Sequence, residues 1–164
     1  MKKISDKLFV GDQSDYENIV KYDKGYYVIH ACKEPYHRQA LGYSGRGAPK
    51  EHPEYLIAYR TNRMICNLVD ADDYRYIPFS LIEIVLKTIN DKIKNNYVFV
   101  HCNQGQSRSA VIGLLYLKDT TSLGSLNFCD AEKEFAKIYP DYNPNKGMRD
   151  FALKYWNHKF IKLE

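Results

Sequence analysis

YVFVHCNQGQSRS, residues 97–109, is the stretch that decides the fold, because it joins a strand, a polar turn and the start of a helix. Tyr97–Val100 is a short run of aromatic and β-branched residues, which is typical of a buried strand. A helix is predicted to follow over Ser107–Lys118. A buried strand that leads through a turn into a helix is the unit from which parallel α/β sheets are built.

The same alternation of strands and helices continues on both sides of this unit. Further strands are predicted at Leu8–Val10, Tyr26–Ile29 and Met64–Val69. Further helices are predicted at Gln13–Lys21, Phe79–Asn95, Asp130–Tyr139 and Lys146–Phe160. The sequence therefore predicts an α/β fold with a central, mostly parallel sheet of four to five strands, flanked by helices, and an all-helical C-terminal third.

Length and composition favour one small domain. The chain has 164 residues and a formal net charge of +4, so we expect a single domain over residues 1–164 and a preference for small anionic groups such as phosphate. The longest strongly apolar run, Val111–Leu117, is far shorter than the ~20 residues that span a bilayer. We expect a cytoplasmic monomer that binds neither membranes nor nucleic acids stably.

The four cysteines, Cys32, Cys66, Cys102 and Cys129, are widely spaced and form no CxxC pair. This spacing favours neither a zinc site nor a disulfide scaffold, and the histidines share no spacing typical of metal ligands. We therefore expect no metal and no cofactor. A cysteine in such a chain becomes reactive only through its neighbours.

Cys102 has such neighbours, because it begins the turn between the predicted strand and helix. Successive backbone N–H groups and a helix N-terminus make this kind of turn an anion site. Gly105 allows a tight turn, and the planar guanidinium of Arg108 can bind two phosphate oxygens. The positive potential would favour Cys102 as a thiolate, which is a nucleophile for the phosphorus of a bound phosphate monoester.

The motif HCxxGxxRS, here His101–Ser109, resembles the signature loop of the cysteine-dependent protein tyrosine phosphatases. Residues 3–19, 109–117 and 143–151 are also similar to the compact dual-specificity branch of that family. The resemblance implies that Cys102 attacks phosphorus, Arg108 binds the phosphate and Ser109 eases departure of the thiolate. It also implies that His101 orders the loop.

Cleavage of a phosphate ester also needs an acid to protonate the leaving oxygen. The resemblance implies an aspartate on a loop about thirty residues before the cysteine. Asp70 is the first choice, because it follows the predicted strand Met64–Val69 and would lie at the crevice edge of the sheet. Asp72 and Asp73 remain alternatives, since predicted strand ends are uncertain by a few residues.

The remaining loop residues are expected to bind the substrate: Asn103, Gln104, Gly105, Gln106 and Ser107. Their side chains are neutral, which favours phosphotyrosine, with or without phosphoserine and phosphothreonine, on a protein. Two alternatives stay open: a module that binds phosphopeptides without hydrolysing them, and a phosphatase for a phosphoinositide or an RNA 5′-phosphate.

Two features lie outside the signature loop. Cys32 follows the predicted strand Tyr26–Ile29, and its place resembles that of a second cysteine in phosphoinositide phosphatases, which implies a redox partner for Cys102. Residues 33–59 show no periodicity and are longer than the usual connection in the family. This atypical loop is expected to influence substrate choice through basic residues such as Arg38, Arg46 and Lys50.

Overall fold

The computed structural model describes residues 1–163, in which six strands form one sheet with the order β1-β2-β6-β3-β5-β4. The strands are β1 (Lys2–Lys3), β2 (Leu8–Gly11), β3 (Tyr26–His30), β4 (Ile57–Arg60), β5 (Arg63–Cys66) and β6 (Tyr97–His101). The four central strands are parallel, and the two edge strands β1 and β4 pair in antiparallel fashion with β2 and β5.

Six α-helices occur in the same residues. They are α1 (Gln13–Asn18), α2 (Arg38–Leu41), α3 (Phe79–Lys92), α4 (Arg108–Thr120), α5 (Phe128–Ile138) and α6 (Lys146–Lys154). Four further helical turns accompany them: η1 (Val20–Tyr22), η2 (Lys33–His37), η3 (Tyr74–Tyr76) and η4 (Ser122–Ser125).

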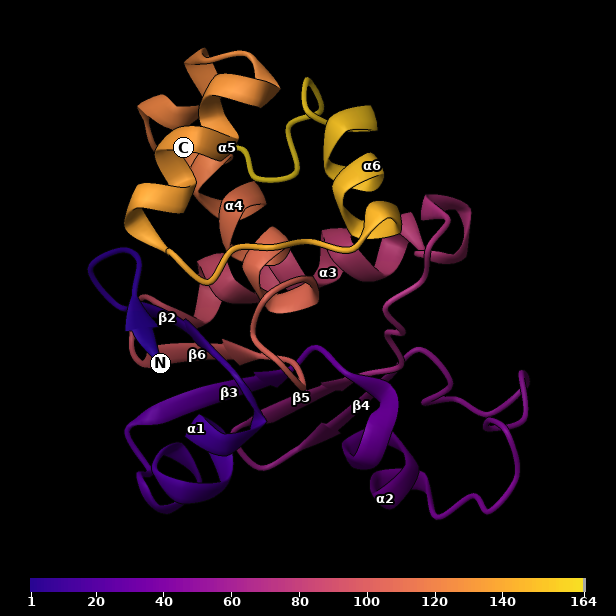
Figure 1. Ribbon diagram of the computed structural model, residues 1–164. Coiled ribbons are helices and arrows are strands. Elements are labelled where there is room, and N and C mark those ends of the chain that lie inside the picture. Colours follow the sequence, from indigo (N-terminus) through magenta and orange to yellow (C-terminus); the bar gives the residue numbers. More distant parts are fainter. Residues whose placement is uncertain (164) are drawn as a thin grey trace.

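Helices cover both faces of the sheet (Figure 1). Helices α3 to α6 lie on one face, and α1, η2 and α2 lie on the other. The four parallel strands are apolar on both sides because both faces are covered, as a parallel sheet requires. Helix α4 is the central helix, and its residues from Arg108 to Asp119 are buried all round.

The predicted fold class is confirmed, and the four predicted strands are the four central strands of the sheet. The short edge strands β1 and β4 were not predicted, since both residues of β1 are exposed and only half of Ile57–Arg60 is buried. Such strands carry little of the apolar pattern on which the prediction rests.

The last helix is shorter than predicted and ends at Lys154 instead of Phe160. The buried carboxylate of Asp119 accepts hydrogen bonds from the backbone N–H groups of Phe160 and Ile161, at 2.8 and 2.9 Å. These two amides therefore bond to a side chain on α4 instead of continuing the helix. The C-terminal third is otherwise helical, as predicted.

The segment 33–59 is more ordered than the absence of periodicity suggested. It contains η2, α2 and the beginning of β4. Arg38 organises its first part: the guanidinium bonds to the Glu34 carboxylate at 2.8 Å and donates to the backbone oxygens of Tyr43 and Gly45, at 3.1 and 2.7 Å. Side chain to backbone bonds of this kind leave no repeat in the sequence.

No helix among residues 1–163 combines the length and apolar character needed to cross a bilayer.

Candidate active site

The loop from His101 to Ser109 leaves the end of β6 and enters α4, and its shape depends on Gly105. This residue has φ +70°, and a Cβ there would lie 2.9 Å from both the backbone carbon and the oxygen of Gly11 at the end of β2. Tyr139 holds the other side of the turn, because its hydroxyl donates to the Gly105 carbonyl at 2.6 Å. Only glycine combines this conformation with such a close approach.

Cys102 lines a cavity of about 560 Å³. The cavity is lined by Asp70, Cys102, Asn103, Gln104, Gln106, Ser107, Arg108, Asn143, Pro144 and Asn145. The side chain of Cys102 is only 2% exposed, and its Sγ atom is 3.2 Å from Oγ of Ser109. The Ser109 hydroxyl also lies 3.2 Å from the Gly11 carbonyl, so it is held between the thiol and β2.

Arg108, the first residue of α4, is held beside the thiol by two hydrogen bonds. Its Nη1 donates to the Leu68 carbonyl at 3.0 Å, and its Nη2 donates to Oδ1 of Asn103 at 2.6 Å. The third donor, Nε, is buried and has no acceptor among the described residues. A buried N–H without an acceptor costs free energy.

Asp70 is the aspartate that lines this cavity. Its Oδ1 accepts a hydrogen bond of 2.8 Å from the Ser107 hydroxyl, and its carbonyl accepts one of 3.1 Å from Nδ2 of Asn145. Asp73 instead bonds to Arg75 at 2.6 Å and caps η3, and Asp72 does not line the cavity. Of the three aspartates considered as the acid, only Asp70 lines the same cavity as Cys102.

His101 lies behind the loop and is fully buried. Its Nδ1 is 3.2 Å from the Cys102 carbonyl, and its Nε2 is 2.6 Å from Nδ1 of a second histidine, His30, at the end of β3. Burial lowers the pKa of His101 to about 4. The imidazole is therefore neutral at physiological pH.

Cys32 lies next to this site, in the same buried cluster as Cys102. Burial raises the pKa of the Cys32 thiol to about 12, and the nearby Arg108 opposes this effect. Both thiols are reduced in the structure. Cys32 is thus placed as the sequence predicted, but its own thiol is protonated and its disulfide partnership stays a prediction.

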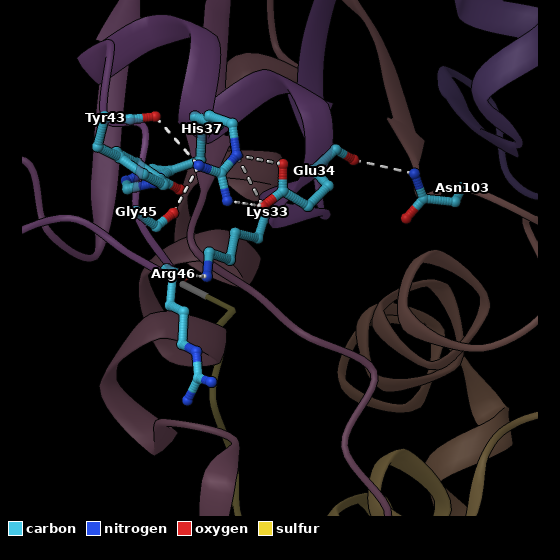
Figure 2. Close-up of polar contacts among 8 residues, drawn as sticks. Lys33, Glu34, His37, Tyr43, Gly45, Arg46 and Asn103 are labelled. Carbon is cyan, nitrogen blue, oxygen red and sulfur yellow. Dashed lines mark hydrogen bonds and ion pairs between the residues drawn. The ribbon is translucent and has the colours of Figure 1, made fainter.

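The segment after β3 touches the signature loop directly. Figure 2 shows the backbone oxygen of Glu34 accepting a 2.9 Å hydrogen bond from Nδ2 of Asn103. In the same view the Lys33 side chain bonds to the backbone oxygen of Arg46. Arg46 is exposed and has no ion pair with a carboxylate among the described residues, whereas Arg38 is paired with Glu34. Of these two arginines, Arg46 is the one without a carboxylate partner among the described residues.

Several residues of the site were missed in the sequence. Tyr139 and Gly11 support the turn from separate elements, and Asn145 at the start of α6 holds both Ser107 and Asp70. Asn145 lies in a segment that resembles the dual-specificity branch, and this was a signal that could have found it. Among residues 1–163, no group of three histidines, cysteines or carboxylates could hold a metal ion.

Comparisons with solved structures define the class by its fold: the chain has the fold of the compact dual-specificity phosphatases.

Three solved structures illustrate the likeness. DUSP15 shares 16% identity with a TM-score of 0.67, over 98% of this chain and 89% of its own. The human tyrosine phosphatase-like serine/threonine/tyrosine-interacting protein shares 20% identity with a TM-score of 0.63, over 94% of each chain. The Yvh1 phosphatase domain from Chaetomium thermophilum shares 16% identity with a TM-score of 0.61, over 93% of this chain and 92% of its own.

Neither a family model nor a curated protein sequence matches the chain. The likeness is therefore one of fold, and the chemistry has to be argued from the site itself.

Proposed function

We propose that the protein hydrolyses phosphate monoesters through a cysteinyl-phosphate intermediate. The observation that carries this proposal is the cavity shared by the Cys102 thiol, the Arg108 guanidinium and the Asp70 carboxyl. A nucleophile, a phosphate-binding cation and a proton donor are the three groups that the reaction needs. The guanidinium of Arg108, which lines this cavity, supports phosphate as the anion, because a phosphate oxygen is a strong acceptor.

In the first step the Cys102 thiolate attacks phosphorus, and the bond from phosphorus to the ester oxygen breaks. The Asp70 carboxyl gives its proton to that oxygen, so the leaving group departs as an alcohol or a phenol. In the second step a water molecule attacks phosphorus, Asp70 accepts the proton of the water, and the sulfur–phosphorus bond breaks. The hydroxyl of Ser109, 3.2 Å from Sγ, stabilises the departing thiolate.

The lining of the cavity favours a substrate with a single phosphate group. Arg108 is the one cationic side chain among the ten lining residues, and the rest apart from Asp70 are neutral. A headgroup with several phosphates would need more cations close together. Phosphotyrosine on a protein, with phosphoserine and phosphothreonine as further substrates, is the class that we propose, in place of a phosphoinositide or an RNA 5′-phosphate.

Hydrolysis of p-nitrophenyl phosphate tests this proposal. We expect the wild type to be active, Cys102→Ser to be inactive, and Asp70→Asn to lose about 10²–10⁴-fold in rate. Asp72→Asn and Cys129→Ser are matched controls at positions outside the cavity and should keep wild-type rates. Activity that survives Cys102→Ser would contradict the cysteinyl-phosphate intermediate.

The second candidate function is a module that binds phosphopeptides without hydrolysing them. The hydrogen bond from Arg108 to the side-chain amide of Asn103 favours it, because this bond keeps the guanidinium in place to bind an anion. It predicts phosphopeptide binding by an inactive wild type. Loss of binding in Arg108→Ala would then identify the same loop as a binding site.

A disulfide between Cys32 and Cys102 is a further part of the proposal, supported by the common buried cluster of the two thiols. Mild peroxide would oxidise Cys102 to a sulfenic acid, and the Cys32 sulfur would displace water to form the disulfide. Non-reducing mass spectrometry should show the linked peptides in the wild type and in Cys66→Ser, but not in Cys32→Ser. If no linked peptide forms in the wild type, this pairing is wrong.

A further inference from the structure

A buried histidine lies directly behind the signature loop, and the proposed mechanism does not use it. His30 is the last residue of β3 and pairs in register with His101, the last residue of β6. Because neighbouring parallel strands in register present such residues on the same face, the two imidazoles meet below the sheet edge. Neither side chain is exposed to solvent.

An aromatic box fixes the planes of both rings. Tyr36 of η2 stacks on His30 with a centroid distance of 4.2 Å, and Tyr16 of α1 stacks on His101 at 5.2 Å with an interplanar angle of 2°. The Tyr36 hydroxyl donates to the Glu17 carboxylate at 2.8 Å, which anchors the box. The two histidines therefore meet in one geometry, with Nδ1 of His30 2.6 Å from Nε2 of His101.

A count of protons determines the tautomer of both rings. The Cys102 carbonyl can only accept, so Nδ1 of His101, 3.2 Å away, carries a proton. A neutral imidazole has one N–H, which makes Nε2 of His101 an acceptor. The 2.6 Å contact then requires a proton on Nδ1 of His30. Nε2 of His30 is left as a bare lone pair, and it has no partner among the described residues.

We propose that His30 is a positioning residue of the active site: by donating its Nδ1 proton to His101, it holds His101 in the tautomer that binds the Cys102 carbonyl. This inference rests on the proposed hydrolytic function for its effect on rate, but the tautomer itself does not depend on that function. Without His30 the proton of His101 can move to Nε2. A lone pair of Nδ1 would then face the lone pairs of the Cys102 carbonyl, and the loop would lose this support.

The surroundings keep both rings neutral. Burial is the largest cause of the low pKa of His30, the neighbouring His101 and Arg63 act in the same direction, and together they lower it to about 2. For His101 burial is again the largest cause, Arg108 acts in the same direction, and Asp15 and Glu17 oppose it. The titratable and charged groups that face the pair are Asp15, Tyr16, Glu17, Tyr36, Arg63, Cys102 and Arg108. The cationic form that would give His101 two N–H groups is thus disfavoured.

Nitrogen NMR of the histidine side chains tests the tautomer directly, because a protonated and a bare ring nitrogen have well-separated ¹⁵N shifts. In the wild type we expect the resonances of His30 and His101 to show the neutral Nδ1–H form from pH 6 to pH 8. The variants His52→Asn and His158→Asn identify the signals of two other histidines and should leave this pair unchanged.

Three substitutions at His30 distinguish the loss of its N–H donor from the loss of its side-chain volume. His30→Phe keeps an aromatic ring against Tyr36 but has no donor. In His30→Asn the side-chain amide nitrogen is as many bonds from Cα as Nδ1 of histidine, so it can replace this donor. In His30→Gln the amide nitrogen is one bond farther from Cα and corresponds in position to Nε2 of histidine. We expect His101 to lose the Nδ1–H signature in the Phe and Gln variants and to keep it in the Asn variant.

The kinetic expectation follows the same order. With p-nitrophenyl phosphate, kcat should fall roughly 10- to 100-fold in His30→Phe, and most of this kcat should be kept in His30→Asn. The magnitude is that found when a hydrogen-bond partner that orients a functional histidine is removed from metal sites. An unchanged Nδ1–H signal of His101 in folded His30→Phe would overturn the inference, as would equal rates for the Phe and Asn variants. If the wild type hydrolyses nothing, the proposed function fails, while the NMR result still decides the role of His30.

Discussion

Gly147, the second residue of α6, controls the distance between that helix and the loop that carries Asp70. A Cβ at this position would lie 2.0 Å from the carbonyl oxygen and 2.8 Å from the carbonyl carbon of Ala71. Ordinary contact begins at about 3.4 Å, so in Gly147→Ala the Ala71 carbonyl has to recede by about 1.4 Å. Both neighbours are backbone, and no flexible side chain can absorb the overlap. The substitution therefore moves the acid loop.

This displacement has a defined effect on catalysis. Asp70 precedes Ala71 directly, and a shift of about 1 Å in a catalytic group can cost on the order of 10²-fold in rate. The free energy of unfolding should fall by about 1–3 kcal/mol, as for other overpacked positions. The loss of rate should be the larger effect, because the acid must lie within hydrogen-bond reach of the leaving oxygen.

Two substrates separate the loss of the acid from a general loss of activity. Phenyl phosphate needs a proton on its leaving oxygen, whereas p-nitrophenolate leaves well without one. We expect kcat of Gly147→Ala to fall about 10²-fold on phenyl phosphate and much less on p-nitrophenyl phosphate. Gly45→Ala is the matched control, since a Cβ there meets nothing within 4 Å. Equal losses on both esters, or wild-type rates in the folded variant, would refute the reasoning.

Three more predictions concern the turn, the adjoining segment and the buried histidines. Tyr139→Phe removes the donor to the buried Gly105 carbonyl and should lower the free energy of unfolding in urea by about 1–3 kcal/mol; an unchanged value would contradict the role of this bond. Arg46→Glu should raise KM for phosphopeptides with acidic flanks and leave p-nitrophenyl phosphate unaffected, as steady-state kinetics can show; parallel changes would count against it. Burial keeps the pKa of His30 (about 2) and of His101 (about 4) below the ordinary 6.5. Below pH 6.5 the unfolded chain therefore binds more protons than the folded chain, and the free energy of unfolding should fall as the pH drops from 6.5 toward 4. The expected slope is roughly 1.4 kcal/mol per pH unit for each histidine in urea titrations, and it should be smaller in His30→Phe.

The part of the fold that was predictable is the part that buries apolar surface with a regular period. Helix α3 buries Ile82, Val85, Leu86 and Ile89 at helical spacing, and β6 is a run of large apolar residues. Segment 33–59 was not predictable for the opposite reason. Its order comes from polar contacts such as those of Arg38 with three separate partners, and such contacts leave no periodic trace in the sequence.

Some residues of the candidate site were predictable from the sequence, and others were not. Cys102, Arg108 and Ser109 follow from one continuous motif, and Asp70 follows from its position after a strand. Tyr139 and Asn145 come from elements more than thirty residues away, and only the packing of α5 and α6 brings them to the loop. A linear motif identifies the groups that react, whereas the residues that hold them depend on the tertiary structure.

His30 shows how this limit applies to a single residue. In the sequence it is an isolated histidine at the end of a strand, and such a residue is most simply read as part of the core. Its proposed role can be inferred only from the tertiary structure. The register of β3 with β6 places it opposite His101, and two tyrosines orient the two rings. Because one proton must lie between Nδ1 of His30 and Nε2 of His101, the register of two strands also determines which nitrogen of His101 faces Cys102. A change in the pairing of β3 with β6 would therefore alter the hydrogen bond between His101 and the Cys102 carbonyl without any substitution in the signature loop.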